Sequence, residues 1–120
     1  MTLLSLDQII GKDDRAHKDV DVPEWGGTVR LQTMSSADRD AYEMEAYRAN
    51  KDGKASAFEN VRARLVSLCW VDEKGELVCS RKDVAALGKK SAKVLNRLWD
   101  ICRDLNGLSQ ADAEELEKNS

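Results

Sequence analysis

The sequence predicts a mainly α-helical domain with a small β-hairpin or sheet, an α+β fold in a single compact helical domain. Two patterns predict it: period-two alternation of apolar residues around a Gly-Gly pair in 20–31, and apolar residues three and four apart in later segments. We expect a mobile arm and linker over 1–19, a folded domain over 20–108, and an acidic helix or tail over 109–120.

The first ten residues predict a short amphipathic helix with Leu3, Leu6 and Ile10 on one face, ended by Gly11. The mixed charges of 12–19 indicate a solvated linker. The arm either packs on the core or contacts a partner, and both alternatives stay open. No basic residue precedes its apolar positions, so a signal peptide is not expected.

The hairpin is predicted because Val20 and Val22 alternate with polar residues, as do Val29 and Leu31. The pair 26–27 can take the positive φ angles of a tight turn. Pro23 lacks an N–H, which favours an edge strand or a break in the ladder, and Trp25 can fold over one face.

A helix over 37–49 is predicted after an N-cap at Ser35 or Ser36, and 50–53 should end it. One side carries acidic residues. The other carries a thin apolar stripe of Ala37, Ala41, Met44 and Tyr47.

A second helix is predicted from Phe58, Val61, Leu65 and Leu68, followed by a buried apolar run to Val71. Residues 72–76 should form a turn. The short strand expected at 77–79 pairs either with 70–71 or with the hairpin.

The clearest helix begins at Lys90 or Ser91 and should end at 106–107, with Leu108 folding back on it. A short helix before it is capped by Ser80 with Asp83 and ends at Gly88. A last, acidic helix opens at 109. The apolar positions of the clearest helix are Val94, Leu95, Leu98, Ile101, Cys102 and Leu105.

No catalytic, cofactor-binding or metal-binding residues are predicted. A phosphate loop and a second histidine are missing, and the carboxylates are spaced along solvated helix faces, so the chain is not expected to be an enzyme. Cys69, Cys79 and Cys102 are far apart among apolar residues, which indicates small buried side chains in a reducing cytoplasm rather than a zinc site.

Charge is distributed unevenly along a chain whose net charge is −3. Segment 81–97 has six basic residues and one acid, a net charge of +5, whereas acid concentrates in 38–45 and 112–117. Ordinary solvated helix faces would explain this. The alternative is head-to-tail self-association, a contact between different patches that builds rings or open spirals. The patches are Arg81, Lys82, Lys89, Lys90, Lys93 and Arg97 against Asp112, Glu114, Glu115 and Glu117.

Several segments, taken in order, carry a family resemblance. The segment from Val22 to Val29 followed by 35–43 resembles the tail assembly chaperones of long-tailed (siphovirus-type) bacteriophages and prophages. So do 60–66 with 71–75, 83–92, and 105–109 with 114–119. The resemblance covers about 20–119, and the arm and linker carry none of it.

The resemblance implies a chaperone that binds the helical tape measure protein, keeps it soluble and promotes assembly of the tail tube around it. It implies action in the host cytoplasm, absence from the mature virion, and a longer form made by −1 ribosomal frameshifting that recruits the tail tube protein. Residues 117–119 can be encoded by GAA AAA AAC, which contains a slippery heptamer.

Candidate contacts with this client are large apolar residues, for each of which core packing is the alternative role. A self-associating protein binding neither membrane nor nucleic acid is expected, because the chain has no spanning segment and is acidic overall. Two alternative functions are a nucleic-acid-binding regulator that uses 81–97, and a structural tail or head-joining subunit of the virion. The candidate contacts with the tape measure protein are Trp25, Met34, Met44, Trp70 and Trp99.

Overall fold

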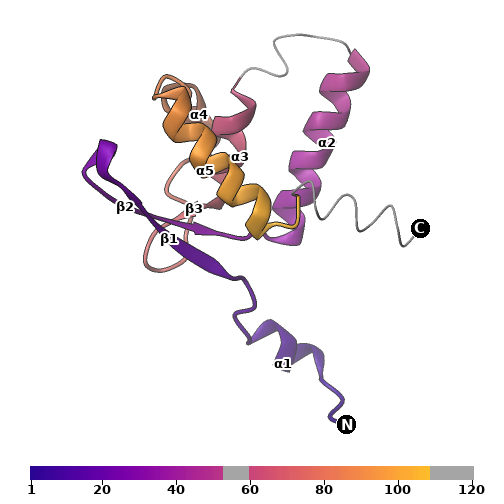
Figure 1. The fold of residues 1–120 in the computed structure, drawn as a ribbon. Coiled ribbons are helices and arrows are strands. Elements are labelled where there is room, and N and C mark those ends of the chain that lie inside the picture. The colour runs from indigo at the N-terminus through magenta and orange to yellow at the C-terminus, as the bar shows by residue number, and fades with distance from the viewer. Residues whose placement is uncertain (53–59, 109–120) are drawn as a thin grey trace.

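A computed structural model describes residues 1–52 and 60–108 (Figure 1). The predicted fold class is confirmed, because helices dominate and a three-stranded antiparallel sheet accompanies them. The elements are α1 (Leu6–Ile10), β1 (His17–Val22), η1 (Pro23–Trp25), β2 (Gly27–Gln32), α2 (Ser36–Asp52), α3 (Val61–Cys69), β3 (Trp70–Val71), η3 (Arg81–Asp83), α4 (Val84–Leu87) and α5 (Ala92–Leu105).

The predicted hairpin is confirmed as the antiparallel pair β1–β2. Val20, Val22, Val29 and Leu31 are all buried, as the alternation predicted. The turn differs, because Pro23 to Trp25 form a single 3-10 turn and the Gly26 N–H donates to the Pro23 carbonyl at 3.1 Å. Of the two turn glycines, Gly26 has a positive φ, of 77°, while Gly27 pairs with Val22 in the ladder.

The ladder also begins earlier than expected. His17 pairs with Gln32 and Asp19 with Arg30, so 17–19, assigned to the linker from sequence, are strand residues. A bidentate ion pair contributes to this extension, in which Arg30 Nε and Nη2 donate to the Asp19 carboxylate at 2.7 and 3.1 Å.

The sheet has the order β1-β2-β3, which makes β1 an edge strand that ends at Val22, just before Pro23. Of the two pairings left open for 77–79, the structure has the one with 70–71. Leu77 bridges to Val71, and the Val78 N–H donates to the Trp70 carbonyl at 3.1 Å. β3 in turn pairs with β2.

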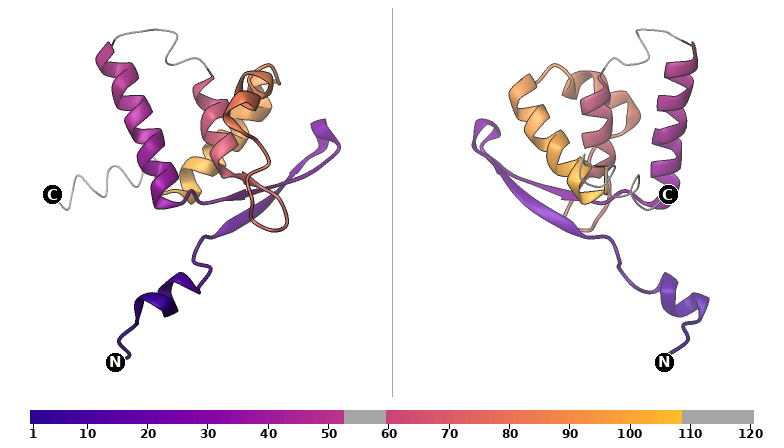
Figure 2. Two further views of the ribbon diagram at one scale, coloured as in Figure 1. Left: turned by 180° about the vertical axis from the view of Figure 1, so that it is seen from behind. Right: turned by 45° about the vertical axis from the view of Figure 1, so that its right-hand side comes forward.

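The core lies where α3 and α5 pack over one face of the sheet (Figure 2). The apolar stripe predicted for α5 is confirmed, because Val94, Leu95, Leu98 and Cys102 are buried and its other two members, Ile101 and Leu105, are half-buried. α3 buries every residue from Leu65 to Cys69. Its predicted start differs, because α3 begins at Val61, which is 37% exposed, and Phe58 lies outside the described residues.

Two of the three cysteines are buried as predicted, Cys69 in α3 and Cys102 in α5, and Cys79 is half-buried. A hydrogen bond with Cys69, together with burial, raises the pKa of the Cys102 thiol. Burial also raises the pKa of Cys79. Cys79 and Cys102 are therefore neutral thiols at pH 7, whereas hydrogen bonds with Cys102 and Asn106 lower the pKa of Cys69.

α2 is attached to the rest of the domain mainly by polar contacts. It is capped by Ser35, whose Oγ accepts from the Asp38 N–H at 3.2 Å. Arg39 Nη1 donates to the Asn106 carbonyl at 2.9 Å, and the Glu45 carboxylate binds both Arg64 and Arg81. Burial works against ionisation of Glu45, but hydrogen bonds from the two arginines outweigh it and hold its pKa below the usual range.

The apolar stripe predicted for α2 does not enter the core. Ala37 and Ala41 are exposed, and Met44 and Tyr47 are 50% and 62% exposed. The half-buried Tyr42 faces the core instead. At 100° per residue Tyr42 and Met44 point to opposite sides of a helix, so packing through Tyr42 leaves the stripe in solvent.

The short elements follow their predicted caps. Ser80 and Asp83 form a reciprocal cap, in which the Ser80 N–H donates to the Asp83 carboxylate at 2.8 Å. α5 ends as predicted, with Gly107 at φ 68° and Leu108 folded back so that its N–H donates to the Arg103 carbonyl at 2.7 Å. Within 1–52 and 60–108, no helix has both the length and the apolar character needed to span a bilayer.

Candidate partner-binding surfaces

The candidate contact residues occupy three different environments. Met34 is buried, with 7% of its surface exposed, and packs in the core. Trp25 and Trp70 come from distant parts of the chain and pack together half-buried, with ring centroids 6.5 Å apart. Only Met44, half of whose surface is exposed, stands free on the surface.

Trp99 is half-buried between two arginines. The guanidinium carbons of Arg62 and Arg103 lie 5.0 and 4.6 Å from its ring centroid. Both guanidinium groups lie over the indole, whose ring attracts cations. A partner would contact these arginines before the ring.

A further exposed apolar surface lies in the N-terminal arm, for which the sequence left open packing on the core or contact with a partner and named no contact residue. We call residues 3–10 the apolar arm. Ser5 and Gln8 cap its helix reciprocally, and Gly11 ends it. The arm projects below the sheet, away from the helices (Figures 1 and 2), so in this structure it does not pack on the core. Its large side chains are Leu3, Leu4, Leu6, Ile9 and Ile10, exposed by 81%, 65%, 70%, 51% and 71%.

The sequence signal for the apolar arm was a short segment rich in apolar residues with no apolar element beside it in the chain. Monomeric soluble proteins rarely expose contiguous apolar surface of this kind, and where they do it usually marks an interaction site. The arm therefore ranks first among surfaces suited to an apolar partner.

The outer face of α2 is a second such surface. We define it as Asp40, Glu43, Met44 and Tyr47, which line a shallow hollow of about 550 Å³. Two apolar side chains one turn apart and two carboxylates line it together. The surface is both apolar and acidic.

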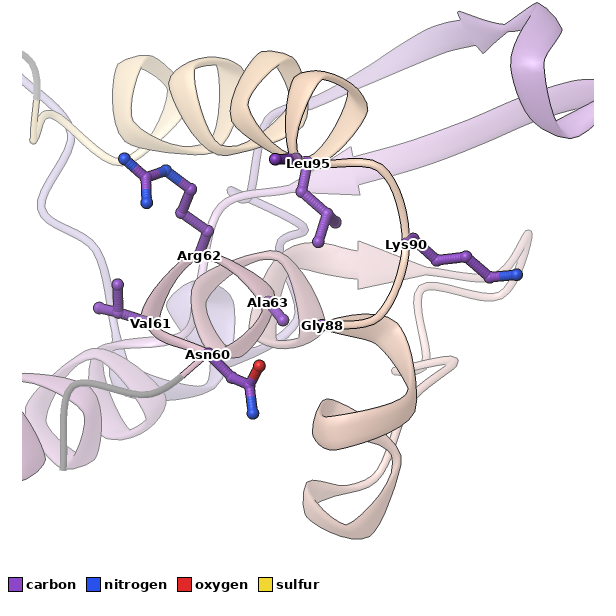
Figure 3. Close-up of a pocket in the computed structure, with 8 residues that line it drawn as sticks. Asn60, Val61, Arg62, Ala63, Gly88, Lys90 and Leu95 are labelled. Atoms are coloured by element: carbon purple, nitrogen blue, oxygen red, sulfur yellow. The ribbon is translucent and has the colours of Figure 1, made fainter. Parts of the chain in front are cut away.

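A smaller hollow of about 210 Å³ lies where the start of α3, the end of α4 and the start of α5 meet (Figure 3). We call it the α3–α5 hollow. Its apolar lining includes the buried Ala63 and Leu95 and the exposed Val61, while Arg62 and Lys90 add positive charge. The remaining lining residues are Asn60, Gly88 and Ala92.

Glycine at 88 permits the close approach of α4 to α3 at this hollow. A Cβ on Gly88 would lie 2.0 Å from the Asn60 Oδ1. Any side chain there would displace the Asn60 side chain, which also lines the hollow, so the shape of the hollow depends on this glycine.

The basic stretch divides into paired and exposed residues. Arg81 binds Glu45, and Arg97 binds Glu24 through two hydrogen bonds of 3.0 Å, which tie the hairpin tip to α5. The bonds from Arg97 lower the pKa of Glu24. The members that form no ion pair within the described residues are Lys82, Lys89, Lys90 and Lys93, all exposed.

The acidic residues proposed as their counterparts, Asp112, Glu114, Glu115 and Glu117, lie outside the described residues. The part of the chain that the structure describes also contains no cluster of three or more histidine, cysteine, aspartate or glutamate residues suited to a metal ion.

A family model described as phage tail assembly chaperone matches residues 6–119. The chain belongs to this family. The match confirms the resemblance found in the sequence and extends it to α1, within the apolar arm. No curated protein matches the chain.

The fold of this chaperone is shared with a solved structure, that of the bacteriophage HK97 tail assembly chaperone. The two chains superimpose with a TM-score of 0.57 at 22% sequence identity, over 83% of this chain and 91% of the other. At that identity the similarity shows a common fold, and the surfaces have to be argued from this chain's own residues.

Proposed function

We propose that this chaperone binds the tape measure protein, keeps it soluble and promotes assembly of the tail tube around it, without catalysing a reaction. It acts in the host cytoplasm and leaves before the virion is complete. The observation that carries the proposal is the apolar arm, five large apolar side chains on a charged, acidic body.

The arm suits a long helical client. An amphipathic helix is recognised through apolar side chains spaced one turn apart, and the arm offers such side chains in return. The contact is small, so one copy binds weakly. Many copies along one client gain avidity without any single strong contact, and their charged bodies keep the complex soluble.

Replacing Leu6 and Ile10 with aspartate should weaken capture of the tape measure protein at least about tenfold, because two large apolar side chains lose their burial in the complex. Both residues are exposed, so the thermal midpoint of the chaperone should not change. The measurement is the fraction of co-expressed tape measure protein that stays soluble and co-purifies.

The matched control is Lys12→Asp with Lys18→Asp, two exposed positions outside the arm, the second in β1, that receive the same new side chains. It should retain the client. Wild-type capture by the Leu6 and Ile10 variant would contradict the role of the arm.

The proposal includes a second, longer product made by −1 frameshifting near residues 117–119, which recruits the tail tube protein. We expect the codons there to contain A AAA AAC and to be followed by an open overlapping −1 frame. Sequencing those nucleotides tests this directly, and codons without the heptamer or the frame would contradict the two-product mechanism.

The proposal also includes self-association of the chain, head to tail, through oppositely charged patches. Because Arg81 and Arg97 bind acids of their own chain, the exposed lysines of 82–93 are the basic residues best placed to meet another copy. Such contacts weaken as salt rises, since exposed charges are screened within about 8–10 Å at physiological ionic strength.

A further inference from the structure

The outer face of α2 is turned away from the core, and its Glu43 pairs with Arg39 of the same helix at 2.9 Å. Tyr42 and Glu45 make the contacts of α2 with the core and with the two arginines, and they project from the opposite side of the helix. Met44 and Tyr47 are nevertheless large, apolar and at least half exposed. A surface of this composition is typical of an interface.

The α3–α5 hollow has the complementary character. Its apolar part can receive apolar side chains, and its rim is positive where the outer face of α2 is negative. Lys90 belongs to the lining, and Lys89 and Lys93 are exposed beside it in sequence. Opposite charges around an apolar centre set the register of a contact and speed encounter.

The two surfaces also lie on opposite sides of the molecule. α2 stands on one side in Figure 1, with α4 and the start of α5 on the other. A contact between them in two copies therefore cannot close on itself as a two-fold dimer. Each pair of copies still has one unoccupied outer face and one unoccupied hollow, so further copies can add through the same contact.

We propose that the outer face of α2 in one copy docks on the α3–α5 hollow of the next, with Met44 and Tyr47 over the apolar lining and Asp40 and Glu43 against Lys90 and Lys93. This rests on the self-association proposed above and names its two faces. The negative partner of the lysines is then α2 rather than 112–117.

Charge exchange between full-length variants tests the pairing. The first variant is Asp40→Lys with Glu43→Lys, and the second is Lys90→Glu with Lys93→Glu. Each should assemble at least about tenfold more weakly than the wild type in low salt, measured by light scattering and sedimentation velocity over a concentration series.

An equimolar mixture of the two variants should recover assembly, because the new lysines of one meet the new glutamates of the other while the unchanged faces make the native contact. A chain that carries all four substitutions should recover as well, and its net charge is again −3. Circular dichroism on each variant checks that it is folded.

Two control variants separate this pairing from net charge. Glu73→Lys with Glu76→Lys changes charge as the first variant does, and Lys12→Glu with Lys18→Glu changes it as the second does, all at exposed positions outside both surfaces. Both should assemble more strongly than the matching face variant. Tyr47→Ser, which leaves charge unchanged, should also weaken assembly.

The outcomes distinguish the two proposals. If the α2 variants assemble like the wild type while the Lys90 and Lys93 variant does not, the lysines meet another acid, such as those of 112–117, and the α2 pairing is wrong although self-association stands. Failure of the mixture to recover would also overturn the pairing. A wild-type chain that stays monomeric at high concentration and low salt would overturn both.

Discussion

Replacing Leu98 with alanine should lower the free energy of unfolding by about 3–5 kcal/mol, the upper part of the range for buried leucines. Leu98 is 1% exposed at the middle of α5, where that helix packs against α3 and β2. Two helices and a sheet cannot all move in to fill the space, so most of the cavity stays open. Domains are stable by only about 5–15 kcal/mol, and the loss is a large part of that.

Urea unfolding followed by circular dichroism measures this loss at 25 °C. Leu77→Ala is the matched control, since Leu77 is 44% exposed and the same atoms are removed. We expect it to cost less than about 1 kcal/mol. Equal losses in the two variants would contradict the placement of Leu98 at the centre of the core.

Replacing Asn106 with alanine should cost about 2–4 kcal/mol, because its side chain satisfies buried backbone groups from both ends of the domain. Its Oδ1 accepts from the Met34 N–H at 2.8 Å, and its Nδ2 donates to the Cys102 carbonyl at 2.7 Å and to the Cys69 sulfur at 3.4 Å. Alanine leaves the Met34 N–H buried without its acceptor.

The position also anchors α2, since the Asn106 carbonyl accepts from Arg39. Asn96→Ala is the matched control, an exposed asparagine in α5 whose side chain accepts only a hydrogen bond from Arg62 in the described structure. Its expected cost is below about 1 kcal/mol. The role of Asn106 would be refuted if thermal and urea unfolding showed the two asparagines to be equivalent.

The hairpin and α5 were predictable because each carries a complete pattern. Val20, Val22, Val29 and Leu31 repeat with period two, and the α5 stripe repeats at three and four with clear end signals. The pairing of 77–79 was not predictable, since a strand of two residues contains no register information. The turn was misjudged because Pro23 favours a 3-10 start as readily as a strand end.

α2 shows why periodicity does not identify the buried face. Its stripe through Met44 and Tyr47 is a real helical pattern, yet the nearby Tyr42 and Glu45 make the tertiary contacts. Whether a face is covered depends on neighbours that the local sequence does not contain. The same holds for the candidate surfaces, where Arg81 and Arg97 bind acids 36 and 73 residues away.

The position of β1 at the edge of the sheet limits how copies of this chaperone can come together. An unpaired strand edge is a template for backbone pairing, and repeated pairing leads to amyloid-like fibrils. β1 exposes Lys18, Asp19 and Asp21 and is followed directly by Pro23, features that discourage such pairing. Assembly by strand addition is therefore disfavoured. Copies then associate through contacts between side chains, which are reversible and sensitive to salt.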